Sequence, residues 1–392
     1  MARLEFQSSF ENINQKDWND LTKSNPFLKL EFFQSLEASK SIGEGTGWHP
    51  FPAIVIDQGK LVGASPIFLK EHSYGEYVFD WSWAEAYQKY GGNYYPKIAS
   101  CIPFTPASGP RIFGLDLSIK KYIVTQIEEL ACENKMSSSH ILFCNESEQD
   151  IYADTKWMLR EGVQFKWFNK NYNNFAEFLS QLSHDKRKKI KQERKKIQDL
   201  GLKIKKIKGP EITESDLDFF YTCYCNTYQD HHSHPYLTRI FFSLIKERMP
   251  ENLLLILAYE GDLPIAASFF IYDDKNLYGR YWGSKSFYPG LHFELSYYQG
   301  QEFCIENGIL AFEGGAQGEH KLARGFEPFN TFSFHRIFDE KFEHAIKDFL
   351  RREKNGIEQY TNELNERAPY KNEFNIQKMV VMEGHDPSTS GL

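Results

Sequence analysis

Apolar residues alternate with small or polar residues in two stretches that lie in different halves of the chain. Residues 52–70 read PAIVIDQGKLVGASPIFLK, and residues 254–272 read LLILAYEGDLPIAASFFIY. Each stretch has an apolar run, a turn that contains a glycine (Gly59 or Gly261), and a second apolar run in which two small residues precede a serine. This pattern predicts one β-hairpin in each half.

A second pattern precedes each hairpin. Residues 26–33 read PFLKLEFF and residues 235–242 read PYLTRIFF, so proline, aromatic and leucine positions recur at the same spacing. A helix followed by a hairpin therefore occurs twice, which indicates an internal duplication. We expect an N-terminal domain over 1–175 and a C-terminal domain over 176–375, followed by an unstructured tail at 376–392.

The second half continues with further periodic segments. Residues 277–284 alternate as a strand does, and residues 292–307 have helical spacing that ends at Gly308 before the apolar run 309–314. Together with the hairpin, these segments predict a mixed sheet with helices on its faces.

Charge is concentrated in one segment. Residues 186–208 contain twelve Lys or Arg residues and two acidic ones, in a chain whose net charge is −7. Residues 184–200 read as a basic helix that ends before Gly201, with an apolar face on one side. Such a helix is either simply solvated or a surface for phosphates of a cofactor, a nucleic acid or an anionic membrane. The apolar positions are Leu182, Ile190, Ile197 and Leu200.

Composition sets further limits. The chain has 392 residues, 41% hydrophobic and 16% aromatic, which is enough for packed cores in two domains. The N-terminus lacks the apolar core of a signal peptide, and the longest apolar run, 253–258, is too short to span a bilayer, so we expect a cytoplasmic protein without a transmembrane segment. The six cysteines lack a repeated C-x-x-C spacing, so no metal site is expected.

A glycine-rich stretch at residues 312–328, FEGGAQGEHKLARGFEP, carries many ionisable groups. Glycines let a ligand approach the backbone closely, so this loop is a candidate site as well as an ordinary solvated connection. It is not a phosphate loop of the Walker type, because Lys321 is followed by Leu322 instead of Ser or Thr.

Three strings carry a resemblance to a known family. PFTPASGPRIF at 103–113, LHFELSYYQG at 291–300 and EGGAQGEHKLARGFEP at 313–328 resemble signature segments of the FemAB-like branch of the GNAT acyltransferase superfamily. The resemblance implies an α/β (α+β) fold of two tandem GNAT-like domains, each a mixed, mostly antiparallel sheet flanked by helices. It also implies an N-acyltransferase that moves an acyl or aminoacyl group to an amine; it does not identify the acceptor, for which a cell-wall precursor of peptidoglycan biosynthesis is one candidate.

The donor is left open by a departure from the superfamily pattern. GNAT enzymes hold the CoA pyrophosphate with an Arg/Gln-x-x-Gly-x-Gly/Ala turn, whereas residues 287–292 lack this turn and residues 88–93 end in Asn93. We therefore expect no tightly bound cofactor. The donor co-substrate is either acyl-CoA held in another way or aminoacyl-tRNA, which the basic helix 184–200 would suit as a tRNA partner.

Acyl transfer to an amine requires a general base at neutral pH. His292 and Glu294 lie at the start of a helix, and Glu313 lies at the end of a strand, where open α/β sheets tend to face their ligands. Glu294 is equally well explained as a first-turn residue favoured by the helix dipole. All three residues are candidate catalytic residues.

Positively charged and aromatic residues are the candidates for substrate binding. Lys321 and Arg324 are three residues apart, so a helical turn would direct both toward one anion. The resemblance implies that a backbone N–H near Trp282 meets the oxyanion. A binding module that holds an anionic ligand or polymer without turnover is the alternative function. The candidate binding residues are Arg111, Arg280, Trp282, His320, Lys321 and Arg324.

Overall fold

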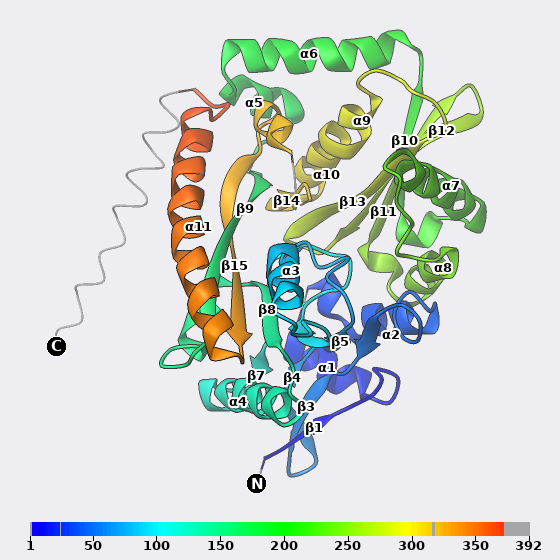
Figure 1. Cartoon of the computed structure of the whole chain (residues 1–392). Coiled ribbons are helices and arrows are strands. Elements are labelled where there is room, and N and C mark those ends of the chain that lie inside the picture. Colours follow the sequence, from blue (N-terminus) through cyan, green and yellow to red (C-terminus); the bar gives the residue numbers. More distant parts are fainter. Residues whose placement is uncertain (1, 24, 316–317, 372–392) are drawn as a thin grey trace, which may run out of the picture.

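The computed structural model describes residues 2–23, 25–315 and 318–371, so the tail expected at 376–392 lies outside the described residues. Its strands form two sheets (Figure 1). The four-stranded sheet has the order β1 (Arg3–Phe6), β3 (Ala53–Asp57), β4 (Lys60–Ser65) and β7 (Phe113–Gly114). The eleven-stranded sheet has the order β10 (Lys203–Lys208), β11 (Leu253–Glu260), β12 (Leu263–Tyr272), β13 (Asn276–Ser284), β14 (Ala311–Glu313), β9 (Met158–Phe168), β15 (Glu327–Ile337), β8 (Ser138–Cys144), β6 (Lys97–Ser100), β5 (Ile67–Lys70) and β2 (Trp48–Pro50).

Helices cover both faces of the sheets, and α11 lies along β9 and β15 (Figure 1). The α-helices are α1 (Gln15–Thr22), α2 (Leu30–Ala38), α3 (Trp81–Lys89), α4 (Leu117–Glu133), α5 (Phe175–Gln181), α6 (His184–Asp199), α7 (Glu214–Asp230), α8 (Arg239–Arg248), α9 (Leu291–Phe293), α10 (Gln299–Asn307) and α11 (Glu340–Glu366). Shorter turns are η1 (Pro26–Leu28), η2 (Glu146–Ile151), η3 (Gly209–Glu211), η4 (Pro250–Asn252), the π-helical η5 (Glu294–Tyr298) and η6 (Glu319–Arg324).

The strand pairing repeats between the two halves, as a duplication requires. In the C-terminal half β10, β11, β12 and β13 pair antiparallel in turn, and β13 then pairs parallel with β14. In the N-terminal half β1, β3 and β4 pair antiparallel, β5 and β6 pair antiparallel, and β6 pairs parallel with β8. The N-terminal series is divided between two sheets because Pro66, which has no N–H, separates β4 from β5.

The two halves also exchange strands. β9 follows the N-terminal series in the chain but pairs with β14 and β15, and β15 in turn pairs with β8. One continuous sheet therefore crosses both halves. The expected boundary near residue 175 falls between β9 and α5, and it stays a prediction because β9 pairs on both sides with strands of the C-terminal half.

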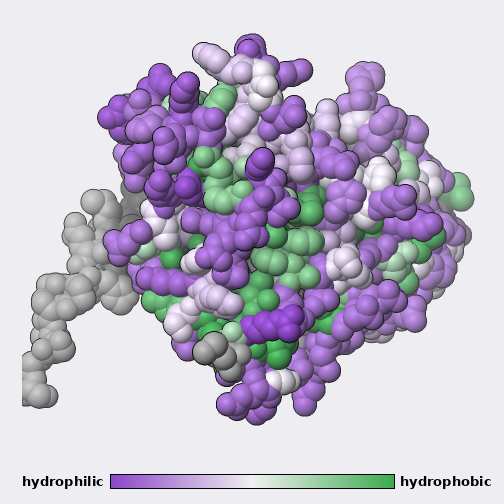
Figure 2. Space-filling model, turned by 60° about the horizontal axis from the view of Figure 1, so that its bottom comes forward, coloured by the Kyte–Doolittle hydropathy of each residue, from purple (hydrophilic) through white to green (hydrophobic). Residues whose placement is uncertain are grey.

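The repeated PFLKLEFF and PYLTRIFF segments pack against each other. Phe32 on α2 and Phe241 on α8, which hold the same position in the two repeats, form an edge-to-face pair with ring centres 5.7 Å apart. Edge-to-face packing of this kind is favourable for aromatic rings. The halves thus share a hydrophobic core, while hydrophilic side chains cover most of the face in Figure 2 and border an apolar patch near its centre.

The expected helices are present with their expected ends. The segment 292–307 is helical from α9 through η5 to α10, and Gly308 follows it in the left-handed region at φ 69°. The basic helix is α6, and Gly201 follows it at φ 67°. Ile190 and Ile197 are buried as expected, whereas Leu200 is half exposed because it lies at the helix end. Figure 1 shows α6 at one edge of the molecule.

Candidate functional site

A parallel strand pair opens between β13 and β14. β14 pairs with β13 only over Asn276–Tyr278, while β13 continues along β12 to Ser284. Beyond Tyr278, β13 therefore has no strand partner on the β14 side among the described residues. Gly314 and Gly315 follow β14 at the opening and leave room there.

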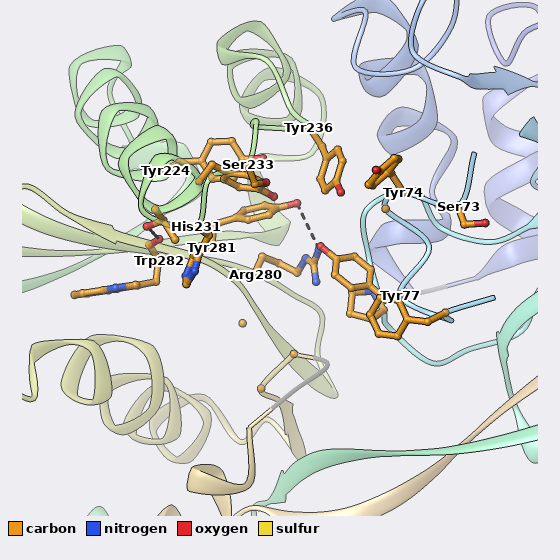
Figure 3. Close-up of a pocket in the computed structure, with 18 of the residues that line it drawn as sticks. Ser73, Tyr74, Tyr77, Tyr224, His231, Ser233, Tyr236, Arg280, Tyr281 and Trp282 are labelled. Atoms are coloured by element: carbon orange, nitrogen blue, oxygen red, sulfur yellow. Dashed lines mark hydrogen bonds between the residues drawn. The ribbon is translucent and has the colours of Figure 1, made fainter. Parts of the chain in front are cut away.

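The opening leads into a cavity of about 460 Å³ between the two halves, which we call the junction cleft (Figure 3). Residues 279–282 of β13 form its floor, and the N-terminal half contributes the segment 73–81 and Pro106. Both halves supply aromatic rings, which Figure 3 shows converging from opposite sides. The aromatic residues are Tyr74, Tyr77, Phe79, Trp81, Tyr224, Tyr228, Tyr236, Tyr281 and Trp282.

Arg280 reaches the junction cleft because of a β-bulge. Phe269 pairs with Tyr281 and Phe270 pairs with Gly279, so Arg280 is an extra residue on β13. Its Nη2 donates hydrogen bonds to the Phe104 carbonyl and to the Tyr281 hydroxyl, 3.4 Å away in the second case. Figure 3 shows the guanidinium pointing toward Tyr77. The structure thus places Arg280 at the junction cleft, and its role in substrate binding stays a prediction.

Trp282 and His292 lie beside each other at the same end of β13. Trp282 lines the junction cleft, and its ring centre is 5.2 Å from that of His292. Burial lowers the pKa of His292 to about 4, and the positive charges of His320, Arg324 and Lys321 act in the same direction. His292 is therefore neutral at physiological pH, with little affinity for a second proton.

Glu313 and Glu294 have different surroundings. Glu313 lines a small cavity that shares Arg280 with the junction cleft, and its carboxylate is 2.7 Å from the Lys166 ammonium. Glu294 instead faces α6, where Arg194 lies 2.8 Å away. Glu294 is not one of the described residues that line the junction cleft or the two smaller cavities next to it. The structure brings Glu313 to the opening and leaves Glu294 behind it.

Lys321 and Arg324 lie on η6, so the expected helical turn is present, but the expectation that both side chains face one anion is wrong. Arg324 donates to Glu193 on α6 at 3.0 Å and stacks 3.4 Å above the Phe293 ring. Lys321 donates instead to the Gly315 carbonyl, and burial lowers its pKa to about 7. The reason for the divergence is Glu193, whose carboxylate draws Arg324 toward the basic helix.

His320 and Tyr297 connect the cleft region to the protein surface. The imidazole of His320 is exposed, and its Nε2 lies 3.0 Å from the Tyr297 hydroxyl. Tyr297 also lines a cavity of about 80 Å³ that shares Arg280 and Trp282 with the junction cleft. His320 is therefore near the site but outside the junction cleft itself.

Arg111 has a structural position. It is fully buried, and its guanidinium donates to the carbonyls of Ala107, Gly109 and Pro110. These bonds fix the segment whose Pro106 lines the junction cleft. The expectation that Arg111 binds substrate is wrong in this structure, because its donors point into its own loop.

Except for Trp282, the aromatic residues of the junction cleft were missed by the sequence analysis. One signal for them exists, because Tyr221, Tyr224 and Tyr228 follow one another at spacings of three and four residues and so share a face of α7. The rings from residues 74–81 carry no such signal, since they lie in a loop and on the first turn of α3.

Two further searches cover the described residues. No group of three or more His, Cys, Asp or Glu side chains there could hold a metal ion. Helices long and apolar enough to cross a membrane are likewise lacking in that part of the chain.

Comparison with known proteins gives one family. The model of the FemAB-like family, described as peptidoglycan biosynthesis/recognition, matches residues 9–372. No curated protein matches the sequence.

Solved structures share the fold at low identity. FemX aligns with a TM-score of 0.52 and 11% identity over 86% of this chain and 99% of its own. The C-terminal domain of a putative lysylphosphatidylglycerol synthetase from Agrobacterium fabrum aligns with a TM-score of 0.51 and 10% identity over 85% and 94%. A conserved protein of unknown function from Bacteroides thetaiotaomicron gives 0.50 and 11% over 86% and 100%. The expected fold of two tandem GNAT-like units is confirmed.

Proposed function

The chain belongs to the FemAB-like family, and from this premise we propose that it is an N-acyltransferase that moves an acyl or aminoacyl group to an amine in the junction cleft. The observation that carries the proposal is the opening of the β13–β14 pair. This opening leaves one edge of residues 279–284 without a strand partner in the described part of the chain, and it brings Arg280 and Glu313 to its sides.

The exposed strand edge suits the chemistry of acyl transfer. Backbone N–H groups on such an edge can donate hydrogen bonds to the oxyanion that forms when an amine attacks an acyl carbonyl. A C–N bond then forms and the C–O or C–S bond to the donor breaks. The amine loses one proton, for which the Glu313 carboxylate is the nearest acceptor at the opening, and the leaving oxygen or sulfur takes up one proton.

The basic helix α6 supports a polyanionic donor such as aminoacyl-tRNA. Its exposed residues include Lys188, Lys189, Lys195 and Lys196. Its inner side is bonded to the site elements, since Glu193 pairs with Arg324 of η6 and Arg194 pairs with Glu294 of η5. A phosphate backbone lying on α6 would therefore be held next to the opening.

A transfer assay tests the proposal. The protein is incubated with aminoacyl-tRNA or acyl-CoA carrying a labelled acyl group and with lysine-containing cell-wall peptides, and the acylated peptide is detected by mass spectrometry. Replacing Glu313 by Gln should lower kcat by roughly 10²- to 10⁴-fold, with partial recovery at high pH where the amine deprotonates without help. Glu294→Gln is the matched control and should retain kcat, because Glu294 faces α6.

One observation favours a binding module without turnover. Both candidate carboxylates are ion-paired, Glu313 with Lys166 and Glu294 with Arg194. The Lys166 ammonium and the Arg194 guanidinium thus occupy these carboxylates, which would otherwise be open to the amine. If labelled donors bind in the same assay and no acyl group reaches any amine, the binding function is favoured over the transferase.

A further inference from the structure

Arg280 lines the junction cleft, whereas Arg111, Arg194 and Arg324 do not, and its partners also differ from theirs. Arg194 pairs with two carboxylates and Arg324 with one, while Arg111 donates to three backbone carbonyls. Arg280 has the Phe104 carbonyl and the Tyr281 hydroxyl as partners of its Nη2. No carboxylate of a described residue lies within ion-pair distance of its guanidinium.

The guanidinium is also poorly satisfied as a donor. Its Nε is buried and has no hydrogen-bond partner in the described part of the chain, as is also true of the Nε atoms of Arg111, Arg324 and Arg336. A guanidinium has five N–H donors and stays charged at physiological pH. The tyrosines around it do not supply negative charge: burial raises the pKa of Tyr77 to about 12, although Arg280 opposes the shift, so this hydroxyl stays protonated.

A cation that is shielded from water and has no counter-ion lowers the stability of the folded state. Where such a group lines a cleft, as Arg280 does and Arg111 does not, it is a candidate for binding a ligand that supplies the missing charge. The walls of the junction cleft offer no substitute, because Asp and Glu are absent from the described residues that line it. Lys is absent from the same lining, and Arg280 and His231 are its basic side chains.

This charge count indicates the kind of anion. One guanidinium balances one negative charge, and its planar fork matches a carboxylate in geometry. A phosphate dianion would call for further donors that the lining does not provide. Tyr77, Tyr228 and Tyr236 also line the cleft and offer aromatic rings to the rest of the ligand.

We propose that Arg280 binds a carboxylate of the acceptor, so that the acceptor is an amino acid or peptide with a free carboxylate and its amine directed to the β13–β14 opening. The proposal rests on the proposed function for the identity of the acceptor, and it names the substrate class of that site. The tyrosine rings then exclude water from the ion pair and strengthen it.

Calorimetric titration with two matched dipeptides tests the proposal. Nα-acetyl-lysyl-alanine carries one amine and one carboxylate, and its C-terminal amide lacks the carboxylate. The wild-type protein should bind the acid on the order of tenfold more tightly than the amide. Equal affinity for the two, or no measurable binding of the acid, would overturn the proposal without any variant being needed. Inorganic phosphate is the third probe, and tighter binding of phosphate than of the acid would also overturn it.

Variants show whether the preference for the acid over the amide depends on Arg280. Arg280→Gln should abolish the difference between acid and amide, and Arg280→Lys should keep part of it, because an ammonium cannot reproduce the fork. Arg239→Gln is the control: Arg239 pairs with Glu214 and Asp218 on the surface, and this variant should bind as the wild type does. Without ligand, Arg280→Gln should melt at or above the wild-type temperature, because an uncompensated charge has been removed. A preference that survives in Arg280→Gln would contradict the proposal.

The two proposals fail in different ways. If the acid is preferred through Arg280 but no acyl group is ever transferred, the proposed function fails and the carboxylate site stands. If amines are acylated equally well with and without a neighbouring carboxylate, the carboxylate site fails and the transferase stands.

Discussion

The two halves share one strand arrangement, but only the C-terminal half has the junction cleft beside its parallel strand pair. Each has a parallel pair joined by helix, β6 with β8 and β13 with β14. In the N-terminal half the chain after β6 returns to the end of β8, where the Gly109 N–H donates to the Phe143 carbonyl at 3.0 Å. In the C-terminal half β13 continues along β12, and the junction cleft forms beside it. The duplicated topology therefore does not by itself make a site; what lies beside the strand ends decides it.

The positively charged side chains also differ between the two halves. Arg111 in the N-terminal half is buried and bonded to its own loop. Lys97 of β6 is also buried, and it lies 2.8 Å from Glu76 and 2.5 Å from Asp80. In the C-terminal half Arg280 faces the cleft without a carboxylate in the described residues. Arg111 and Lys97 thus hold the structure of the N-terminal half, and a ligand is expected at Arg280 because it lines the cleft.

The largest expected effect is on the N-terminal half. Arg111→Ala should lower the free energy of unfolding by about 3–5 kcal/mol, because it leaves a cavity and three carbonyls without their donor. Urea unfolding measures this loss, and Arg3→Ala, whose side chain is 80% exposed, is the control. Unchanged stability together with weaker substrate binding would mean that the N-terminal half also holds a ligand site.

A smaller loss is expected where α6 joins the C-terminal half. Arg324→Ala removes a charged hydrogen bond to Glu193 and should lower the free energy of unfolding by about 1.5–3 kcal/mol. A double-mutant cycle with Glu193→Gln should give less than the sum of the single losses. If Arg324→Ala instead raises KM and leaves stability unaltered, Arg324 contacts substrate after all.

The contributions of Lys321 and Lys97 to stability should depend differently on pH between pH 7 and pH 9. The folded-state pKa of Lys321 is lowered to about 7, below the value of about 10.4 in an unfolded chain. Between these values the unfolded chain binds the extra proton, so stability due to Lys321 rises with pH, by at most about 1.4 kcal/mol per unit. The melting temperature of the wild type relative to Lys321→Met should therefore increase from pH 7 to pH 9.

Lys97 provides the comparison for that experiment. Its neighbours Asp80 and Glu76 outweigh burial and raise its pKa above the ordinary value. Its contribution is therefore fully present below the unfolded pKa and is lost only at higher pH. Between pH 7 and pH 9 Lys97 itself therefore adds no pH dependence to the melting temperature of the wild type, in contrast to Lys321.

The smallest effect on stability is expected on the outer face of α6. Replacing Lys188, Lys189, Lys195 and Lys196 with Gln should change the free energy of unfolding by less than about 0.5 kcal/mol per site, since exposed charges contribute little. Binding of tRNA should nevertheless weaken, and its dependence on salt should become shallower. The control carries the same number of exposed changes in the N-terminal half. It replaces Lys16, Lys23, Lys60 and Lys135 with Gln. Equal tRNA binding by the two variants would leave α6 as a solvated surface.

Local patterns in the sequence predicted much of the fold. Alternation and glycine turns located both hairpins, and Gly201 and Gly308 marked the ends of their helices because each takes a left-handed conformation that glycine adopts most easily. The repeated segments indicated the duplication, and family strings gave the fold class. Of the sequence candidates, Arg280, Trp282 and Glu313 lie on β13 and β14 and line the junction cleft or the small cavity beside it, and their roles stay predictions.

Only the tertiary structure decided which side chains meet. The pairing of β9 with β14 and β15 joins segments that are far apart in the chain, and no local pattern records such a pairing. Glu193 lies within a basic helix, and nothing in the neighbouring sequence indicated that its carboxylate would form an ion pair with Arg324. Arg111 is likewise of a residue type that often binds anions, but the fold buries it completely. Sequence fixes the chemistry and the local conformation of each residue, whereas burial and ionic partners depend on contacts across the whole fold.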